Sequence, residues 1–335
     1  MSHPVSDGKY FAVTPLKTRH AQSTNKLISS ALLLLVTIFN FAPAYASGYD
    51  IWLYPLTFDS QTTEWQLGSA SPISNREGYD NQPAFSSDSQ HIMFASDRSG
   101  EHNDIYQYQL NKNSNSRVKQ LTHTPNESEY SPQPFITEQD ELAGIRYIIE
   151  QGVPHQSVWQ QADQQTPSRT IKSMIPTGYY AHHPELGTLL WARYAYSLYF
   201  EASSTSDSTQ GADERHFVVA NAGRSIHVIP QEKAFSYLHK QQDGDRVIKR
   251  FDPLSGSHIP LIGVGNGNED YAWSNNGWIF NIDTNRLRSV NTLKLGQKTW
   301  QSISTLQPPT KLHHSPSRVA ISPDLKHMAI VWSRK

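Results

Sequence analysis

The sequence predicts an all-β protein, a six-bladed β-propeller whose blades are four-stranded antiparallel sheets. Three observations support this fold class. Short segments in which apolar and polar residues alternate are separated by turn residues, and a degenerate repeat recurs about every 47 residues. The incomplete repeat at the C-terminal end has its missing strands at the N-terminal end of the repeat region. Helical periodicity is almost absent from the 335 residues.

The clearest repeat unit begins with "YDNQPAFSSDSQHIMFASDRSGEHNDIYQYQL", residues 79–110. Apolar residues alternate on both sides of a Ser-Asp-Ser turn at 87–89, and a second turn follows at 96–100. "DIYQYQL" then predicts a third strand, and "RVKQLTHT" at 117–124 predicts a fourth. Four strands in about 45 residues correspond to one propeller blade.

Further copies follow at similar intervals. Three of them place a tyrosine four residues before a proline, in "YDNQP", "YSPQP" and "YAHHP", and later copies are more degenerate. The predicted blade starts are Pro83, Pro134, Pro184, Pro230, Tyr271 and Val319. Six starts predict six blades.

The sixth start leaves room for only two strands before Lys335. The missing pair is expected from the other end of the repeat region, because "YDIWLYPLTF" at 49–58 matches "NDIYQYQL" in register. We therefore expect residues 49–58 to lie against 318–332, in a clasp of N- and C-terminal strands that removes open sheet edges.

Residues 1–46 are expected to lie outside the propeller, which is predicted to span 47–335. Lys26 precedes a short apolar run, and Ala44-Tyr45-Ala46 is a small-x-small cleavage pattern. A positively charged n-region, an apolar h-region and a cleavage site with small residues are typical of a secretory signal peptide. An uncleaved signal anchor is the alternative. A spanning helix needs about 20 apolar residues, and Ser29, Ser30, Thr37 and Asn40 interrupt this run.

The repeat resembles that of the TolB-like β-propeller family, also called the WD40-like or PD40 repeat. "PAFSSDSQHIMFASDRSGEHNDIY" matches its pattern across Pro83–Tyr106, and "AISPDLKHMAIVWS" matches the first half of that pattern. The resemblance implies a propeller only, without the α/β domain that precedes the propeller in TolB. It also implies periplasmic roles, either docking of envelope proteins or substrate gating beside a catalytic domain.

Composition and motifs exclude several classes. The sequence has no cysteine, which excludes disulfides, thiolate nucleophiles and Cys-ligated zinc. With 30 acidic residues against 29 Lys and Arg, it lacks the basic surplus of a nucleic-acid-binding protein. It contains no G-x-S-x-G elbow, no H-E-x-x-H motif and no phosphate-binding loop.

The candidate binding residues are acids, histidines and tyrosines close to a predicted blade start, where loops are expected to surround the central channel. They are Tyr79, Asp80, Glu129, Tyr130, Tyr180, His182, His183, Glu269, Asp270, His313 and His314. Aromatic rings beside acids and imidazoles suit a polar ligand, a cation or the end of a partner's peptide. The alternative is that they are solvated loop residues. No catalytic residue, protein-bound metal or cofactor is expected, although the acids leave room for a cation in the channel.

These observations predict an exported, non-catalytic propeller, periplasmic or secreted, that binds an envelope protein or a small polar ligand. No nucleic-acid partner is expected, and membrane contact is expected only if the N-terminal segment is uncleaved. Two alternatives remain open. One is a carbohydrate-active lyase or hydrolase on the propeller face, and the other is the periplasmic sensor part of a membrane-anchored regulator.

Overall fold

The computed structural model describes residues 48–111, 117–136, 142–150, 156–162, 166–171, 175–203, 215–265, 268–292 and 299–335. The expected signal segment, 1–46, lies outside the described residues. Within these ranges the chain forms strands and no helix, so no helix there has the length and apolar character to cross a bilayer.

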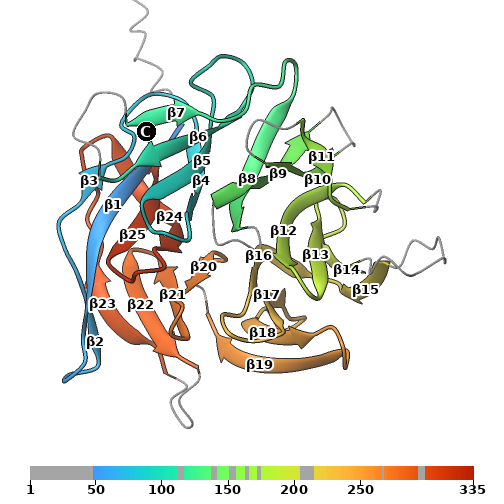
Figure 1. Cartoon of the computed structure of the whole chain (residues 1–335). Helices are drawn as coiled ribbons and strands as arrows, with labels where there is room; N and C mark the ends of the chain where they lie inside the picture. The colour runs from blue at the N-terminus through green and yellow to red at the C-terminus, as the bar shows by residue number, and fades with distance from the viewer. Residues whose placement is uncertain are drawn as a thin grey trace, which may run out of the picture. The chain divides into compact units, whose positions relative to one another are not determined.

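The strands form six antiparallel sheets, which are the six blades of a propeller (Figure 1). Blade 1 contains β4 (Asp80–Phe85), β5 (His91–Ser96), β6 (Asp104–Gln109) and β7 (Val118–Gln120). Blade 2 contains β8 (Ser128–Ile136), β9 (Leu142–Glu150), β10 (Gln156–Ala162) and β11 (Ser168–Arg169). Blade 3 contains β12 (Thr177–His183), β13 (Gly187–Ala192), β14 (Ser197–Ala202) and β15 (Arg215–Val219).

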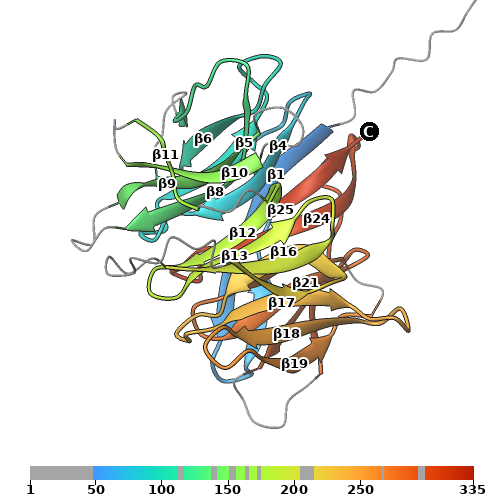
Figure 2. The same ribbon diagram turned by 90° about the vertical axis from the view of Figure 1, so that its right-hand side faces the viewer.

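The remaining three blades complete the ring, and blade 4 lies in the lower half of the turned view in Figure 2. Blade 4 contains β16 (Ala222–Val228), β17 (Phe235–Lys240), β18 (Arg246–Asp252) and β19 (Ser257–Gly263). Blade 5 contains β20 (Tyr271–Trp273), β21 (Trp278–Asp283), β22 (Arg286–Asn291) and β23 (Gln301–Thr305). Blade 6 contains β24 (His313–Ile321) and β25 (His327–Arg334), joined by β1 (Gly48–Asp59), β2 (Glu64–Leu67) and β3 (Ser71–Pro72).

The predicted six-bladed fold and its clasp are confirmed. β1 pairs antiparallel with β25 in a continuous register from Gly48 opposite Arg334 to Pro55 opposite His327, and the two strands lie side by side in blue and red in Figure 1. β24 lies on the inner side of β25, and β2 and β3 lie on the outer side of β1. The blade is therefore built from β1, β2 and β3 at one end of the repeat region and from β24 and β25 at the other.

The core consists of six apolar clusters, each between two successive blades. Alternation along the strands produces this arrangement, because successive side chains point to opposite faces of a sheet. In β25, Met328, Ile330 and Trp332 pack towards blade 5, whereas Ala329 and Val331 pack towards blade 1. No blade can bury both of its faces alone, so stability depends on closing the ring.

The predicted blade starts fall at or near the innermost strands, with a difference in blades 3 and 4. Pro83, Pro134 and Val319 lie inside β4, β8 and β24, and Tyr271 begins β20. Pro184 and Pro230 instead lie in the turns that follow β12 and β16.

Candidate functional site

The six innermost strands surround a cavity of about 390 Å³ on the axis of the ring. Each of β4, β8, β12, β16, β20 and β24 contributes side chains to its wall. The wall is mainly apolar towards the C-terminal ends of these strands, where Ile226, Ala272 and Val319 contribute. Its charged residues are Arg224, Asp270 and Arg318, which lie towards the N-terminal ends of the strands.

β-bulges place the polar residues in this cavity. The register of strand pairing shifts at a bulge in three innermost strands. The bulges lie between Asn81 and Ala84 in β4, between Ala222 and Ile226 in β16, and between Pro316 and Val319 in β24. An extra residue in one strand redirects side chains out of the regular alternation. Gln82, Arg224 and Arg318 lie within these bulges and line the cavity. We call this level of the channel, defined by Gln82, Arg224, Asp270 and Arg318, the bulge end.

Two guanidinium groups and one carboxylate form the centre of the bulge end. Asp270 accepts two hydrogen bonds from Arg224, from Nε at 3.1 Å and from Nη2 at 2.6 Å. Arg318 Nη1 lies 3.8 Å from the same carboxylate, and its Nη2 donates to the hydroxyl of Tyr179 at 2.6 Å. The Arg318 guanidinium also lies 5.1 Å from the centre of the Tyr179 ring.

The cluster keeps a surplus positive charge at physiological pH. Burial alone would raise the pKa of Asp270, but Arg318 and Arg224 outweigh burial and hold this pKa below its usual value. Burial likewise opposes the charged form of Arg224, yet the hydrogen bonds to Asp270 raise its pKa. One carboxylate therefore faces two permanently charged guanidinium groups. Such a centre favours an anion over the cation that the acids alone suggested.

Two histidines in the cavity wall are held neutral. Burial, supported by the charge of Arg146, lowers the pKa of His182 to about 4. Burial lowers the pKa of His227 to about 4 against the opposing effect of Asp270. The His227 ring lies 4.7 Å from the Tyr271 ring, and its Nε2 is hydrogen-bonded to Ser225 Oγ. These imidazoles add no charge to the channel near neutral pH.

We expect His227→Phe to reduce the loss of stability when the protein is acidified. The unfolded histidine takes up a proton near pH 6.5, whereas folded His227 does so only near pH 4. Stability is therefore lost as pH falls through this window, by about 1–2 kcal/mol between pH 7 and pH 5. Denaturant unfolding at both pH values measures the effect, with the exposed His314→Phe as control. An equal acid loss in wild type and His227→Phe would contradict the assignment.

Of the eleven predicted residues, few reach this cavity. Asp270 lies at its centre and His182 lines its wall. Tyr180 also lines it through its backbone strand, but the Tyr180 ring is buried between blades 2 and 3. Tyr79 and Tyr130 line a second cavity beside the first, and their rings meet edge to face at 6.3 Å.

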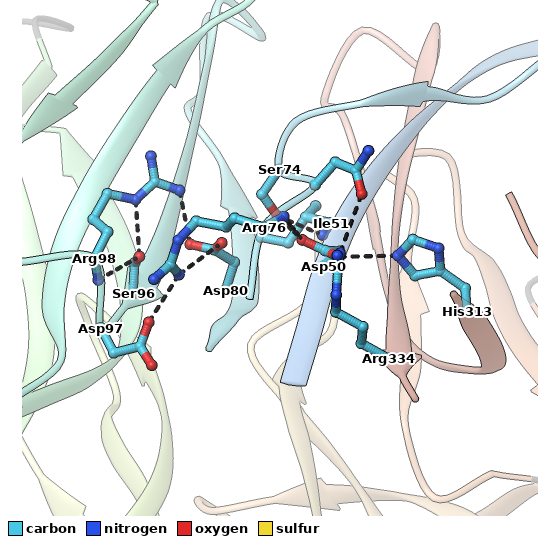
Figure 3. A network of polar contacts seen from close by, with 11 residues as sticks. Asp50, Ile51, Ser74, Arg76, Asp80, Ser96, Asp97, Arg98, His313 and Arg334 are labelled. Carbon is cyan, nitrogen blue, oxygen red and sulfur yellow. Dashed lines mark hydrogen bonds and ion pairs between the residues drawn. The ribbon is translucent and has the colours of Figure 1, made fainter. Parts of the chain in front are cut away.

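Two of the predicted residues belong to a buried ion network that joins blades 6 and 1 (Figure 3). Asp80 pairs with Arg98 at 2.8 Å and with Arg76 at 3.2 Å. His313 Nε2 lies 2.9 Å from Asp50 Oδ2 in the clasp, and neither side chain is exposed. These contacts show Asp80 and His313 packed within the protein, away from the channel.

The other predicted residues have local partners. Glu129 is fully buried and accepts hydrogen bonds from Thr122 and Thr124. Glu269 pairs with Lys240 at 2.5 Å. His183 is the last residue of β12, where its Nδ1 accepts the N–H groups of the following turn, at the opposite end of that strand from the bulge. His314 is exposed on β24.

The sequence prediction missed Arg224, Arg318 and Tyr179. "GRSI" and "SRVA" each place an arginine within the bulge of an innermost strand, two residues before Ile226 in blade 4 and one residue before Val319 in blade 6. The predicted start at Pro230 moved blade 4 out of phase and concealed this signal.

The described residues contain no group of three or more His, Asp or Glu side chains arranged to hold a metal ion. This agrees with the local geometry, because the channel carboxylate is already engaged by two guanidinium groups.

No protein-family model matches the sequence, and no curated protein sequence matches it. Solved structures do match its fold. The structure of putative TolB from Agrobacterium tumefaciens aligns with a TM-score of 0.56 and 12% identity, over 86% of this chain and 98% of that one. The fold of this chain is similar to that of this TolB-like β-propeller. The resemblance read from the repeat is therefore confirmed at the level of architecture.

Two further solved structures that match the fold belong to longer chains. TolB from Acinetobacter baumannii aligns with a TM-score of 0.50 and 10% identity, over 85% of this chain and 65% of that one. A puromycin-hydrolyzing peptidase from Mycobacterium tuberculosis aligns with a TM-score of 0.50 and 10% identity, over 79% of this chain and 47% of that one. The chain thus spans less than two thirds of either protein. At these identities the likeness concerns the fold alone.

Proposed function

We propose that this TolB-like propeller is an exported, non-catalytic binding protein that takes an acidic group of an envelope protein, or a small anionic ligand, into the bulge end of its channel. The observation that carries the proposal is the pairing of two guanidinium groups with a single carboxylate in the wall of a 390 Å³ cavity.

The contacts of Arg318 support an anionic ligand. Arg224 already engages Asp270 through two hydrogen bonds, whereas Arg318 is 3.8 Å from that carboxylate. A guanidinium carries five N–H donors, and within the described residues one of those of Arg318 is hydrogen-bonded, to Tyr179. Carboxylates suit the remaining donors, because guanidinium binds them through short, charge-assisted hydrogen bonds.

Binding of short peptides tests this proposal directly. We expect a tetra-aspartate peptide to bind and a tetra-lysine peptide not to bind, as measured by isothermal titration calorimetry. Arg318→Gln should weaken binding of the acidic peptide by roughly tenfold or more, since hydrogen bonds to charged groups are worth about 1.5–3 kcal/mol. Arg286→Gln, which removes an exposed ion pair on β22, is the matched control. Equal binding of both peptides, or no effect of Arg318→Gln, would contradict the proposal.

Export rests on the N-terminal segment. The positive head, the apolar run and the Ala44-Tyr45-Ala46 exit support a periplasmic or secreted location. Cell fractionation distinguishes the sensor alternative, in which the segment stays uncleaved and the protein sediments with membranes. A cleaved protein should appear in the periplasmic or extracellular fraction, with Ser47 as its first residue.

One observation favours the enzyme alternative enough to test it. His182 and His227 are neutral imidazoles in the same cavity as the arginines, and a neutral imidazole can act as a general base. Incubation with acidic and neutral oligosaccharides should yield no new products if the protein only binds. Products released by the wild type and lost in His227→Gln would replace the binding role with a catalytic one.

A further inference from the structure

A second cavity of about 390 Å³ opens beside the first and shares Gln82, Tyr179 and Arg224 with it. Its wall is unusually aromatic. The lining rings are Tyr79, Tyr130, Tyr179, Trp191, Tyr194 and Tyr196. We call this cavity the aromatic groove.

The rings form two rows of edge-to-face contacts. In one row, Tyr79 lies between Tyr49 and Tyr130, with centroid distances of 5.8 and 6.3 Å. In the other row, Trp191 lies between Tyr179 and Tyr196, at 5.6 and 5.7 Å. The first row thus combines rings from blades 6, 1 and 2, the second row consists of rings from blade 3, and each ring in a row is supported by a neighbour.

We propose that the aromatic groove holds an extended, proline-containing acidic segment of a partner protein, whose acidic residue reaches Arg224 and Arg318 in the channel. This inference rests on the proposed function and specifies its partner. Proline-rich segments adopt the polyproline II helix, and aromatic-lined grooves are the usual docking sites for that conformation.

The polar groups of the groove fit such a segment. The Tyr130 hydroxyl accepts a hydrogen bond from Asn103, and the Tyr179 hydroxyl accepts one from Arg318. Each hydroxyl therefore keeps its own hydrogen for an acceptor on the ligand. A proline-containing backbone offers carbonyl acceptors and few N–H donors.

Charge favours an acidic segment. The charged residues that line the groove are Arg193 and Arg224, and no Asp or Glu is among its described lining residues. Arg193 is paired with Glu150 at 3.3 Å, so the unbalanced charge lies towards the channel, where two guanidinium groups share Asp270. An acidic residue at one end of the segment therefore has a defined place.

The backbone of Tyr196 indicates that this ring has a role other than folding. Tyr196 is 57% exposed, and it occupies the left-handed region at φ 49° in the turn before β14. Glycine and asparagine favour that conformation, and a bulky side chain adopts it at a cost. Its backbone is fixed there by hydrogen bonds to Ala192 and Ala222. A strained, exposed aromatic residue on the rim of an aromatic groove fits a binding residue better than a structural one.

The decisive experiment uses a synthetic oligoproline peptide that carries two aspartates at one end, titrated into the intact protein. A second peptide keeps the aspartates but replaces proline with glycine, and an acidic oligosaccharide is a third probe. We expect the proline peptide to bind at least roughly tenfold more tightly than the glycine peptide. Tyr196→Asn should weaken binding of the proline peptide by a similar factor while the melting temperature stays the same or rises.

Two further variants keep the result clear. Tyr194→Ser removes another exposed ring of the groove, which is 54% exposed, and should weaken the proline peptide in the same way if Tyr196→Asn folds poorly. Phe217→Ser removes a 60% exposed ring on β15, outside the lining of either cavity, and should leave binding unchanged.

The outcomes separate this inference from the proposed function. Equal binding of the proline and glycine peptides, with dependence on Arg318 retained, would overturn the aromatic groove as a proline site and leave the proposed anion site in the channel intact. Loss of any preference for acidic peptides would overturn both. Tighter binding of the acidic oligosaccharide than of either peptide, sensitive to Tyr196→Asn, would assign the groove to sugars and overturn the inference.

Discussion

Glu129→Gln is expected to stabilise the protein at pH 8 by about 3 kcal/mol and to leave its stability unchanged below pH 4.5. Burial raises the pKa of Glu129 to about 7 despite the hydrogen bonds from Thr122 and Thr124, whereas the unfolded chain titrates near 4.5. The folded state therefore binds the proton more tightly. Its contribution to stability is fully present below pH 4.5 and is lost as pH rises through 7.

The cause is visible when two junctions between blades are compared. At the junction of blades 6 and 1, Ile51 N donates to Ser74 Oγ, and at the junction of blades 1 and 2, Ile105 N donates to Thr122 Oγ1. In both, a buried aspartate, Asp50 or Asp104, precedes the isoleucine. The backbone arrangement is thus repeated.

The countercharges differ between these junctions. Asp50 and Asp80 have Arg334, Arg76 and Arg98 as partners, as Figure 3 shows. Asp104 accepts hydrogen bonds from Ser99 and Gln120, and the described residues supply no ion pair to it or to Glu129. A second carboxylate nearby then raises the pKa of Glu129 further. An uncompensated buried carboxylate is most stable with its proton bound.

Denaturant unfolding of wild type and Glu129→Gln between pH 4.5 and 8 measures the effect. The two stability curves should coincide at the acidic end and diverge as pH rises. Glu101→Gln, at an exposed position in the neighbouring blade 1, should follow the wild type at every pH. Parallel curves for wild type and Glu129→Gln would show that the buried carboxylate is already ionised at low pH.

The fold was largely predictable because its signals are local or repeated. "SSDSQ" predicts a turn, and Asp88 indeed accepts the N–H of Gln90 there. The clasp followed from the similarity of "YDIWLY" to "NDIYQY", which reflects the same position of β1 and β6 in their blades.

The site was less predictable because it depends on residues brought together by ring closure. Arg318 and Tyr179 are hydrogen-bonded across the ring, although 139 positions separate them in sequence. Whether a buried acid meets an arginine depends on the nearby loops, since Asp80 is paired with Arg76 and Arg98, whereas Glu129 accepts hydrogen bonds from threonines. The types of residue near the blade starts therefore identified candidates. They could not show which of these residues line the channel and which belong to the buried ion network of the clasp.

Asp50→Asn is expected to destabilise the protein by about 3 kcal/mol, since removal of one partner from a buried ion pair typically costs 3–5 kcal/mol. Asp50 lies in β1 and is completely buried. Its carboxylate meets Arg334 Nη1 of β25 at 2.8 Å and His313 Nε2 of β24 at 2.9 Å. It also accepts a hydrogen bond from the Ser74 hydroxyl. One side chain thus joins strands from both ends of the described chain.

The loss of stability in Asp50→Asn should be localised to the pairing of β1 with β25, which closes the ring. Asparagine keeps the shape of Asp50 but removes the charge that Arg334 and His313 meet, so β1 should separate from β25 more often than other strand pairs do. Hydrogen exchange of the amides in β1 and β25 should therefore accelerate more than exchange in blades 3 and 4. Asp59→Asn, which alters an exposed turn cap at the other end of β1, is the matched control and should change stability by less than about 1 kcal/mol.

The double variant Asp50→Asn, His313→Gln tests whether the clasp acts as a unit. His313 is fixed by Asp50 on one side and by Thr310 on the other, and its ring meets Trp52 edge to face. If the pair is coupled, the double variant should cost less than the sum of the two single variants. Strict additivity, or uniform acceleration of exchange around the ring, would mean that the apolar clusters hold the propeller closed and that the Asp50 network contributes little to closure.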